Sequence, residues 1–368
     1  MFTQYQTPDT WNRKLERAMA FKRTTDDVHP SATEYTAKTG QYDLFTTLVT
    51  PPDRPTYYSS YWLVFFLHGS NGYDYFAVGH VVAYTHCTPP KPLFRVCLLD
   101  IHDGYWFGES FPTLDSPFQL DAVDFRSDRF ELYASSSPGK DSLVCKSRVA
   151  GAEFDLVVSP RGPNLYAGGP GTFFWGTDWT YQMSYPEMWV TGALQYQGET
   201  IEVVPQKSMA WLDRQYGVGT GTAGWDLYML LFENGLKMSI WRSEACAGVE
   251  GATKKYMATV VYPDDGHHEI YPLDDDCVES SRPFVSDETG YLYHAHQVIT
   301  IPGLDARIEM EQPWPVGEMV VKGNPDVVST LFEGYVDVRA RIRGGRLRDG
   351  GFRSGGSHCN EGRLCYDL

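Results

Sequence analysis

Short apolar runs separated by turn residues dominate the chain from residue 57 onward. Tyr61–His68 and Tyr75–Tyr84 flank the turn sequence Ser70-Asn71-Gly72, which predicts a β-hairpin. The other short apolar runs bounded by turn residues are Leu93–Ile101, Phe125–Ala134, Phe154–Ser159, Trp225–Phe232, Leu236–Arg242, Tyr256–Tyr262, Tyr291–Ile301 and Val327–Val338. Because turns separate these runs where a parallel sheet would need helices, the pattern predicts antiparallel β-sandwiches or barrels.

Interruptions in this pattern divide the chain into segments. Residues 1–50 form a lead-in before the first strands, and the turn-rich segment Gly198–Pro205 separates two β-rich halves. We therefore expect one β domain over residues 51–198 and a second over residues 199–340. Residues 341–368 are rich in Arg and Gly and show no strand pattern, which predicts a flexible tail.

The charge balance narrows the class of partner. The chain has 368 residues, with 31 Lys and Arg against 47 Asp and Glu, a net charge of −16. This excess of acidic residues disfavours nucleic acid and anionic membranes, since a basic face supplies the affinity for both. The basic tail is more typical of a solvated chain end than of an RNA contact. The longest apolar run, Tyr61–Leu67, is much shorter than the roughly 20 residues that span a bilayer.

Cysteine and histidine spacing indicates neither a disulfide framework nor a metal site. The seven cysteines are scattered without a CxxC pair, and the pairs His267-His268 and His294-Ala295-His296 lack a third ligand. The first residues contain no apolar signal-peptide region, and no Asn-x-Ser/Thr acceptor occurs. These features predict a cytoplasmic protein without a bound metal.

The segment Trp211–Gly217 carries the clearest candidate chemistry. On a strand, Asp213 shares a face with Trp211 and Gln215, whereas Arg214 points to the opposite side. A carboxyl group desolvated between an aromatic ring and an amide has a raised pKa. It can then donate a proton to an alkene, epoxide or carbonyl near neutral pH. The alternative is an ion pair of Asp213 with a neighbouring arginine that stabilises a turn, and the local sequence alone favours this alternative.

Aromatic residues are abundant, with 10 Trp, 24 Tyr and 19 Phe. Those in or beside predicted strands include Trp62, Tyr75, Tyr181, Tyr185, Trp211, Trp225, Tyr228 and Trp241. Desolvated ring faces attract a cation by about 1–2 kcal/mol, so a pocket lined by them can stabilise a carbocation. Each ring taken singly is more typical of a hydrophobic core.

Four short motifs occur together in the order found in a known family. They are Tyr181-Gln182-Met183-Ser184-Tyr185-Pro186, Trp211-Leu212-Asp213-Arg214-Gln215-Tyr216-Gly217, Gly224-Trp225-Asp226 followed by Asn234-Gly235, and Leu331-Phe332-Glu333-Gly334-Tyr335. In these motifs the chain resembles the acyclic carotenoid hydratase (hydroxyneurosporene synthase) family, whose fungal relatives include kievitone hydratase. The resemblance spans about residues 57–338 and is strongest over 180–242.

This resemblance implies an all-β fold of two lipocalin-like antiparallel β-barrel or sandwich domains side by side, with a pocket near their junction. It also implies acid catalysis on a hydrophobic small-molecule substrate, without an organic cofactor or metal. Asp213 matches the family's proposed acid. The residues expected to contact substrate or tune the acid are Trp62, His80, Tyr185, Trp211, Arg214, Trp225 and Glu333.

The leading hypothesis is a cofactor-independent Brønsted-acid enzyme of secondary metabolism, in which Asp213 protonates an alkene or epoxide of an isoprenoid-bearing substrate. Capture of the cation by water gives hydration, and exclusion of water gives rearrangement or cyclisation. Three alternatives stay open: a pericyclase acting on a polyene, a non-catalytic carrier of a hydrophobic metabolite, and a structural protein that uses the Arg-rich tail. The sequence does not indicate an oligomeric state.

Overall fold

β-Strands are the main secondary structure of the described chain, which confirms the all-β prediction. The computed structural model describes residues 56–84, 91–112, 123–134, 142–219, 222–263, 266–321, 330–343 and 345–356. The helical elements within these ranges are two short 3₁₀ turns, η2 Pro205–Lys207 and η3 Pro302–Leu304. No helix in this part of the chain is long and apolar enough to cross a membrane. The expected lead-in at residues 1–50 lies outside the described ranges.

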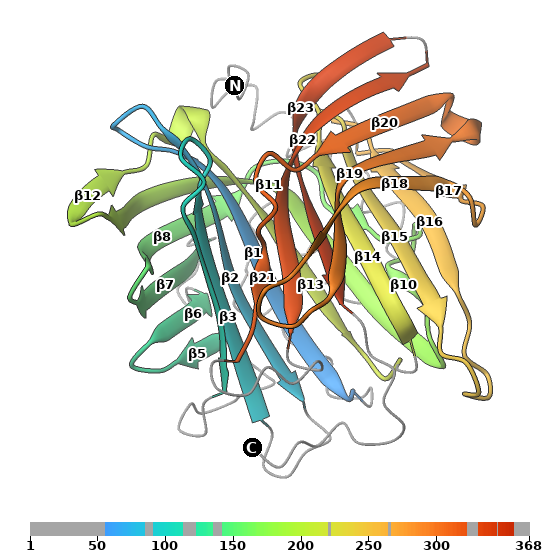
Figure 1. Cartoon of the computed structure of the whole chain (residues 1–368), viewed down its shortest axis with the longest axis horizontal. Helices are drawn as coiled ribbons and strands as arrows, with labels where there is room; N and C mark the ends of the chain where they lie inside the picture. The colour runs from blue at the N-terminus through green and yellow to red at the C-terminus, as the bar shows by residue number, and fades with distance from the viewer. Residues whose placement is uncertain are drawn as a thin grey trace, which may run out of the picture.

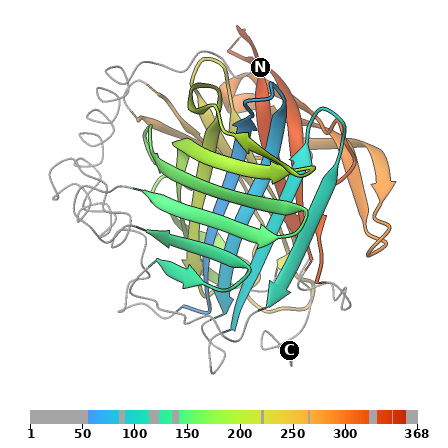
Figure 2. The same cartoon turned by 90° about the vertical axis from the view of Figure 1, so that its left-hand side faces the viewer.

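The first sheet contains 13 antiparallel strands. They are β1 Tyr58–His68, β2 Asp74–Tyr84, β3 Lys91–Asp100, β4 Trp106–Pro112, β5 Asp124–Arg126, β6 Phe130–Ala134, β7 Leu143–Val149, β8 Ala152–Pro160, β9 Leu165–Tyr166, β10 Thr172–Trp175, β11 Asp178–Tyr196, β12 Glu199–Glu202 and β13 Met209–Gly217. Their order is β4-β3-β2-β1-β13-β11-β8-β7-β6-β5, with β9, β10 and β12 attached to β11. The sheet curls on itself, so that β6 to β8 run across β1 and β2 (Figure 2).

The second sheet contains 10 strands and lies beside the first (Figure 1). They are β14 Thr222–Leu231, β15 Lys237–Ala245, β16 Lys255–Val261, β17 His268–Pro272, β18 Val278–Val285, β19 Leu292–Ile301, β20 Ala306–Glu311, β21 Glu318–Met319, β22 Leu331–Ile342 and β23 Gly345–Gly356. Their order is β17-β16-β15-β14-β23-β22-β20-β19-β18, with β21 attached to β22. The predicted β1–β2 hairpin is confirmed, whereas the predicted run Phe125–Ala134 is divided between β5 and β6.

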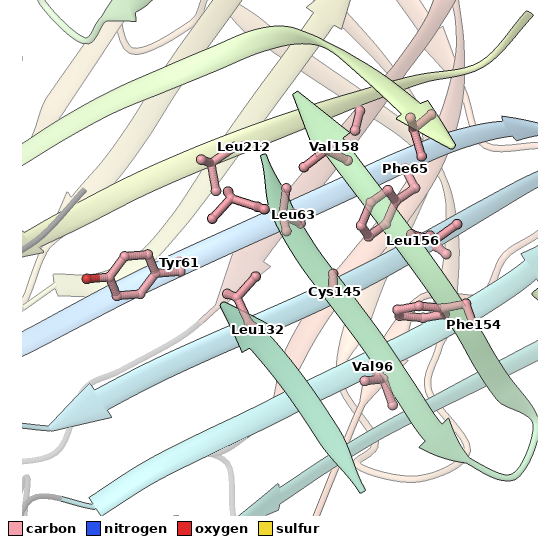
Figure 3. Packing of buried hydrophobic residues seen from close by; sticks show 14 of the residues in the cluster. Tyr61, Leu63, Phe65, Val96, Leu132, Cys145, Phe154, Leu156, Val158 and Leu212 are labelled. Carbon is pink, nitrogen blue, oxygen red and sulfur yellow. The ribbon is translucent and has the colours of Figure 1, made fainter. Parts of the chain in front are cut away.

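Strand β1 is apolar on both faces because each face is buried in a different core. Its residues Tyr61, Leu63 and Phe65 point into the core enclosed by the curled first sheet (Figure 3). The alternate residues Trp62 and Val64 point toward the second sheet and join a core shared by both sheets. A third core lies within the second sheet. Side chains that face the shared core are therefore the ones that both domains can contact.

The division of the chain between the two sheets differs from the sequence-based expectation. The segment around Gly198 was expected to separate two domains, but it is the turn between β11 and β12, with Gln197 at φ 52° and Gly198 at φ 82°. Strand β13 follows and inserts between β1 and β11 of the first sheet. The first sheet thus extends to Gly217, because a strand's partners are set by long-range backbone pairing that local turn composition does not encode.

The basic tail also differs from the expectation. Residues 345–356, assigned to a flexible segment, form β23, which pairs with β22 on one side and β14 on the other. Backbone hydrogen bonds hold a strand whatever its side chains are, so an Arg/Gly-rich composition concealed this element. The rest of the predicted tail from residue 357 lies outside the described ranges.

One cysteine of the described chain forms a disulfide bond, which the sequence did not indicate. Cys97, Cys145 and Cys277 are free thiols, whereas Cys246 is disulfide-bonded. The scattered spacing had suggested no disulfide framework.

Candidate active site

Five side chains from adjacent strands form one row across the face of the first sheet that meets the second sheet. From β11 to β3 they are Ser184, Asp213, Trp62, His80 and Arg95, each registered directly opposite the next. Directly opposed residues of antiparallel strands point to the same face. Because Trp62 belongs to the shared core, the whole row points toward the second sheet.

Asp213 is a buried carboxyl group, with 2% of its surface exposed. Ser184 Oγ donates to its Oδ1 at 2.5 Å, and Gln182 Nε2 donates to its Oδ2 at 2.6 Å. The other end of the Gln182 amide accepts a hydrogen bond from the indole N–H of Trp241 on β15. Because an indole N–H can only donate, this bond fixes the orientation of the amide. Gln182 therefore joins the carboxyl group to the second sheet.

Burial raises the pKa of Asp213 to about 6, although the hydrogen bonds from Ser184 and Gln182 and the charge of Arg214 act in the opposite direction. The hydrogen bonds that Asp213 accepts from Ser184 and Gln182 come from neutral donors, and the Arg214 guanidinium lies on the opposite face of the sheet, over the ring of Tyr61. This geometry matches the desolvated acid and not the alternative of a turn-stabilising ion pair. With this pKa, about a tenth of the carboxyl groups are protonated at pH 7.

Tryptophan rings from both sheets gather around this row. The ring centroids of Trp62 and Trp225 lie 6.5 Å apart, and those of Trp225 and Trp241 lie 5.6 Å apart. Trp175 at the end of β10 lies 6.3 Å from Trp225 and 6.0 Å from Trp241, and Phe173 lies 5.8 Å from Trp241. We call these five residues the aromatic cluster. Its π faces can stabilise a cation formed next to them.

His80 is held in a neutral form and stacks on Trp62. The two rings have centroids 4.1 Å apart and an angle of 20° between their planes. Arg95 lies 3.0 Å from Nδ1 of His80, and Ser60 Oγ lies 2.9 Å from its Nε2. Because a guanidinium only donates, Nδ1 carries the lone pair and Nε2 carries the proton. Burial, together with the charge of Arg95, lowers the pKa of His80 well below its usual value. His80 therefore packs against Trp62 as a neutral imidazole whose one N–H is directed to Ser60.

Glu333 reaches the same interface from the second sheet. It is fully buried on β22, on the same face as Leu331 and Tyr335 of the shared core. Burial lowers the pKa of Arg95, and the charge of Glu333 is among the interactions that oppose this shift. A carboxyl and a guanidinium from different sheets thus interact across the shared core.

Two predicted site residues lie on the other face of the sheet. Tyr185 is buried in the core enclosed by the first sheet. The guanidinium of Arg214 lies 4.1 Å from the ring centroid of Tyr61 in that core and donates to the backbone oxygen of Ser60 at 3.1 Å. Alternation along β11 and β13 turns both side chains away from Asp213. They cannot contact a substrate at the aromatic cluster, and Arg214 acts on Asp213 only through its charge.

The remaining predicted residues, Trp62, His80, Trp211, Trp225 and Glu333, share the interface with Asp213. Sequence reasoning missed Gln182 and Ser184 as partners of the carboxyl group. A signal was present, because both lie at alternate positions of the motif that begins at Tyr181. Arg95 and Trp175 carried no comparable signal, since the contact of each depends on strands that are distant in sequence.

The histidine pairs that the sequence offered as metal ligands make hydrogen bonds within the protein. His268 Nδ1 donates to Gly266 O at 2.8 Å, and its Nε2 accepts from the backbone N–H of Tyr166 at 3.0 Å. His296 contacts Ser281 and Glu309 at the surface. Among the described residues, no group of three or more His, Cys, Asp and Glu side chains is arranged to hold a metal ion.

Comparison with known proteins identifies the family of the chain. The model of the AttH-like family matches residues 117–350, more than half of the chain. The chain belongs to the AttH-like family. Among curated proteins, dehydratase asqC of Emericella nidulans is 27% identical over 283 residues, 73% of this chain and 76% of the relative. Kievitone hydratase of Fusarium solani subsp. phaseoli is 24% identical over 190 residues, 50% of this chain and 53% of that protein.

Solved structures share the fold. The crystal structure of kievitone hydratase from Nectria haematococca aligns with a TM-score of 0.72 at 19% identity, covering 81% of this chain and 88% of that one. A protein assigned as AttH from Nitrosomonas europaea aligns with a TM-score of 0.67 at 17% identity, covering 84% and 95%. These likenesses bear out two lipocalin-like β domains and the resemblance found in the motifs. The AttH-like chain is an enzyme of the hydratase and dehydratase type, like its named relatives.

Proposed function

We propose that Asp213 is the Brønsted acid of a reaction that adds water to, or removes it from, a hydrophobic isoprenoid-bearing small molecule bound between the two sheets. The observation that carries this proposal is a buried carboxyl group beside the aromatic cluster, with a pKa raised to about 6. An acid whose pKa lies near the working pH can both give and take back a proton. Hydration and dehydration need both steps.

Asp213 alone can carry out every proton transfer of this reaction. In dehydration, the Asp213 carboxylic acid protonates the leaving hydroxyl, the C–O bond breaks, and water and a tertiary carbocation form. The Asp213 carboxylate then removes a proton from the adjacent carbon, which gives the alkene and restores the acid. Hydration runs the same steps in reverse, and the proton released by the attacking water returns to the carboxylate. An epoxide opened by the same acid gives rearrangement or cyclisation when water does not attack.

The surroundings of Asp213 fit these steps. Ser184 and Gln182 each occupy one lone pair of the carboxylate, and the second lone pair of each oxygen stays able to exchange a proton. The indole faces of Trp62, Trp225 and Trp241 supply the electron-rich surface that a carbocation requires. Burial and the charge of Arg95 lower the pKa of His80 and keep it neutral, so no imidazolium opposes the positive charge of the intermediate.

The test is to incubate the enzyme with aromatic compounds bearing a prenyl alkene, its tertiary alcohol or its epoxide in oxygen-18 water, and to analyse the products by mass spectrometry. We expect interconversion of alkene and alcohol with incorporation of the label. Asp213→Asn should lower the rate at least about a hundredfold, the usual contribution of a general acid. Asp155→Asn is the matched control, since that half-exposed carboxylate on β8 pairs with Lys146 at 2.9 Å, outside the shared core.

The outcomes separate the candidate functions. A product of unchanged mass from the epoxide, lost in Asp213→Asn, assigns the rearrangement or cyclisation branch. Conversion of a polyene that Asp213→Asn leaves intact favours a pericyclase. Binding without conversion favours a carrier. Near-normal turnover of the alkene or alcohol by Asp213→Asn contradicts Asp213 as the acid.

A further inference from the structure

Three buried hydrogen-bond donors belong to Trp175 and Trp225 of the aromatic cluster and to Ser243, which is paired with Trp225. Within the described part of the chain, Trp175 Nε1, Trp225 Nε1 and Ser243 Oγ have no hydrogen-bond partner. Ser243 is fully buried and stands directly opposite Trp225 in the β14–β15 ladder, so both side chains face the first sheet. The ring of Trp175 lies 6.3 Å from that of Trp225.

Buried donors without an acceptor are costly. Each one loses about 1–3 kcal/mol relative to its hydrated state, so native proteins retain few of them. An indole N–H can only donate a hydrogen bond, and it cannot be satisfied by another donor. The Ser243 hydroxyl, opposite Trp225 in the ladder, is a further donor. Together these groups suit an acceptor oxygen such as a carbonyl and offer nothing to a purely hydrocarbon group.

We propose that Trp175, Trp225 and Ser243 form a subsite that binds a carbonyl oxygen of the substrate. This inference rests on the proposed function, since it assigns the end of the molecule that does not react. Ser243 lies two residues beyond Trp241 on the same face of β15, about 7 Å along the strand. Trp241 is joined through Gln182 to Asp213. The substrate class is therefore an apolar, alkene-bearing or alcohol-bearing molecule that also carries a carbonyl group several bonds from the reacting carbon.

A binding experiment tests the subsite without turnover. The probes are 2-acetylnaphthalene and 2-isopropylnaphthalene, which have similar shape and differ in the carbonyl oxygen, with affinities measured by equilibrium dialysis. Wild-type protein should bind the ketone about tenfold more tightly than the hydrocarbon, equivalent to one or two good hydrogen bonds. Ser243→Ala and Trp225→Phe should each reduce this preference about threefold or more, and Ser243→Ala should leave hydrocarbon binding nearly unchanged.

The matched control is Ser239→Ala, the same substitution on the same face of the same strand. Ser239 lies on the other side of Trp241, opposite Met229, away from Trp225 and Trp175. Its removal should leave the ketone preference intact. Equal binding of the two probes to wild type, a preference that survives in both Ser243→Ala and Trp225→Phe, or an equal loss in Ser239→Ala overturns the proposal. Thermal unfolding of each variant verifies that it is folded.

Asp213→Asn separates this inference from the proposed function. It should keep the ketone preference, because Asp213 lies outside the subsite, while losing turnover. If Asp213→Asn retains turnover and the ketone preference persists, the acid assignment fails and the subsite stands. If the preference is absent while Asp213→Asn is inactive, the subsite fails and the acid assignment stands.

Discussion

Asp213 and Trp62 stand directly opposite each other on adjacent antiparallel strands, and both side chains point toward the second sheet. Their Cβ atoms are expected about 4.5–5.5 Å apart in such a pair. The indole of Trp62 is in turn fixed by its stack on His80, whose pKa is lowered by burial and by the charge of Arg95. The carboxyl group therefore titrates beside a ring face of fixed position.

The rate of reaction should depend on pH through Asp213. Because the protonated carboxyl is the active form and its pKa is raised to about 6, kcat/KM should be constant below pH 6 and fall with rising pH above it. The decline should approach about tenfold per pH unit when a single proton is required. Stopped assays between pH 4.5 and 8.5 provide the measurement. A rate that increases through this range would show that the ionised form starts the reaction.

Folding stability should depend on pH through the same group. The folded-state pKa of about 6 lies above the ordinary value of 3.8, so the folded protein holds this proton more tightly than the unfolded chain. The associated stability is present below pH 3.8 and is lost as the pH rises through 6. Asparagine does not ionise, so Asp213→Asn removes this loss. The free energy of unfolding of the variant, relative to that of wild type, should therefore increase by about 2–3 kcal/mol from pH 4 to pH 7.5. Urea unfolding of both proteins at the two pH values measures the difference.

A variant whose stability follows that of wild type across this range would contradict the shifted pKa. Asp155→Asn serves as the comparison, because that side chain is half-exposed.

Local sequence predicted the parts of the site that depend on strand periodicity. The alternation in residues 211–217 placed Asp213 on the face of Trp211 and put Arg214 on the other face, and the structure has both arrangements. Assigning Arg214 and Tyr185 to the site followed the family motifs and disregarded this alternation. The partners of Trp225 and Trp175 depend on how two sheets pack, and the position of β13 depends on pairing with a strand about 150 residues earlier. No local pattern encodes such contacts.

Gly79 should be required by the packing of the first core. A Cβ atom at this position would lie 2.5 Å from Cys145 Sγ and 3.3 Å from the ring of Phe130. Gly79→Ala should therefore destabilise the fold by about 1–3 kcal/mol, the usual cost of overpacking. Chemical denaturation measures this cost. The double variant Gly79→Ala, Cys145→Ala should recover part of it, because removing the sulfur makes room for the new methyl group. Additive losses in the double variant would exclude a direct clash.

Gln182 should set the pKa of the acid and link the two sheets. Gln182→Leu removes a hydrogen bond that lowers the pKa of Asp213, so the falling limb of the pH–rate profile should move to higher pH. It also leaves the buried N–H of Trp241 without its acceptor, which should cost about 1–3 kcal/mol of stability.

Gln215→Leu is the matched control for this substitution. Gln215 lies on β13 two residues from Asp213 and donates to Thr180 Oγ1 at 3.2 Å, with no bond to the carboxyl group. It should leave the pH of the falling limb in place. If Gln182→Leu lowers the rate equally at every pH, then Gln182 only supports the structure. A shift of the limb, with the plateau below pH 6 retained, identifies it as the residue that positions and tunes the acid.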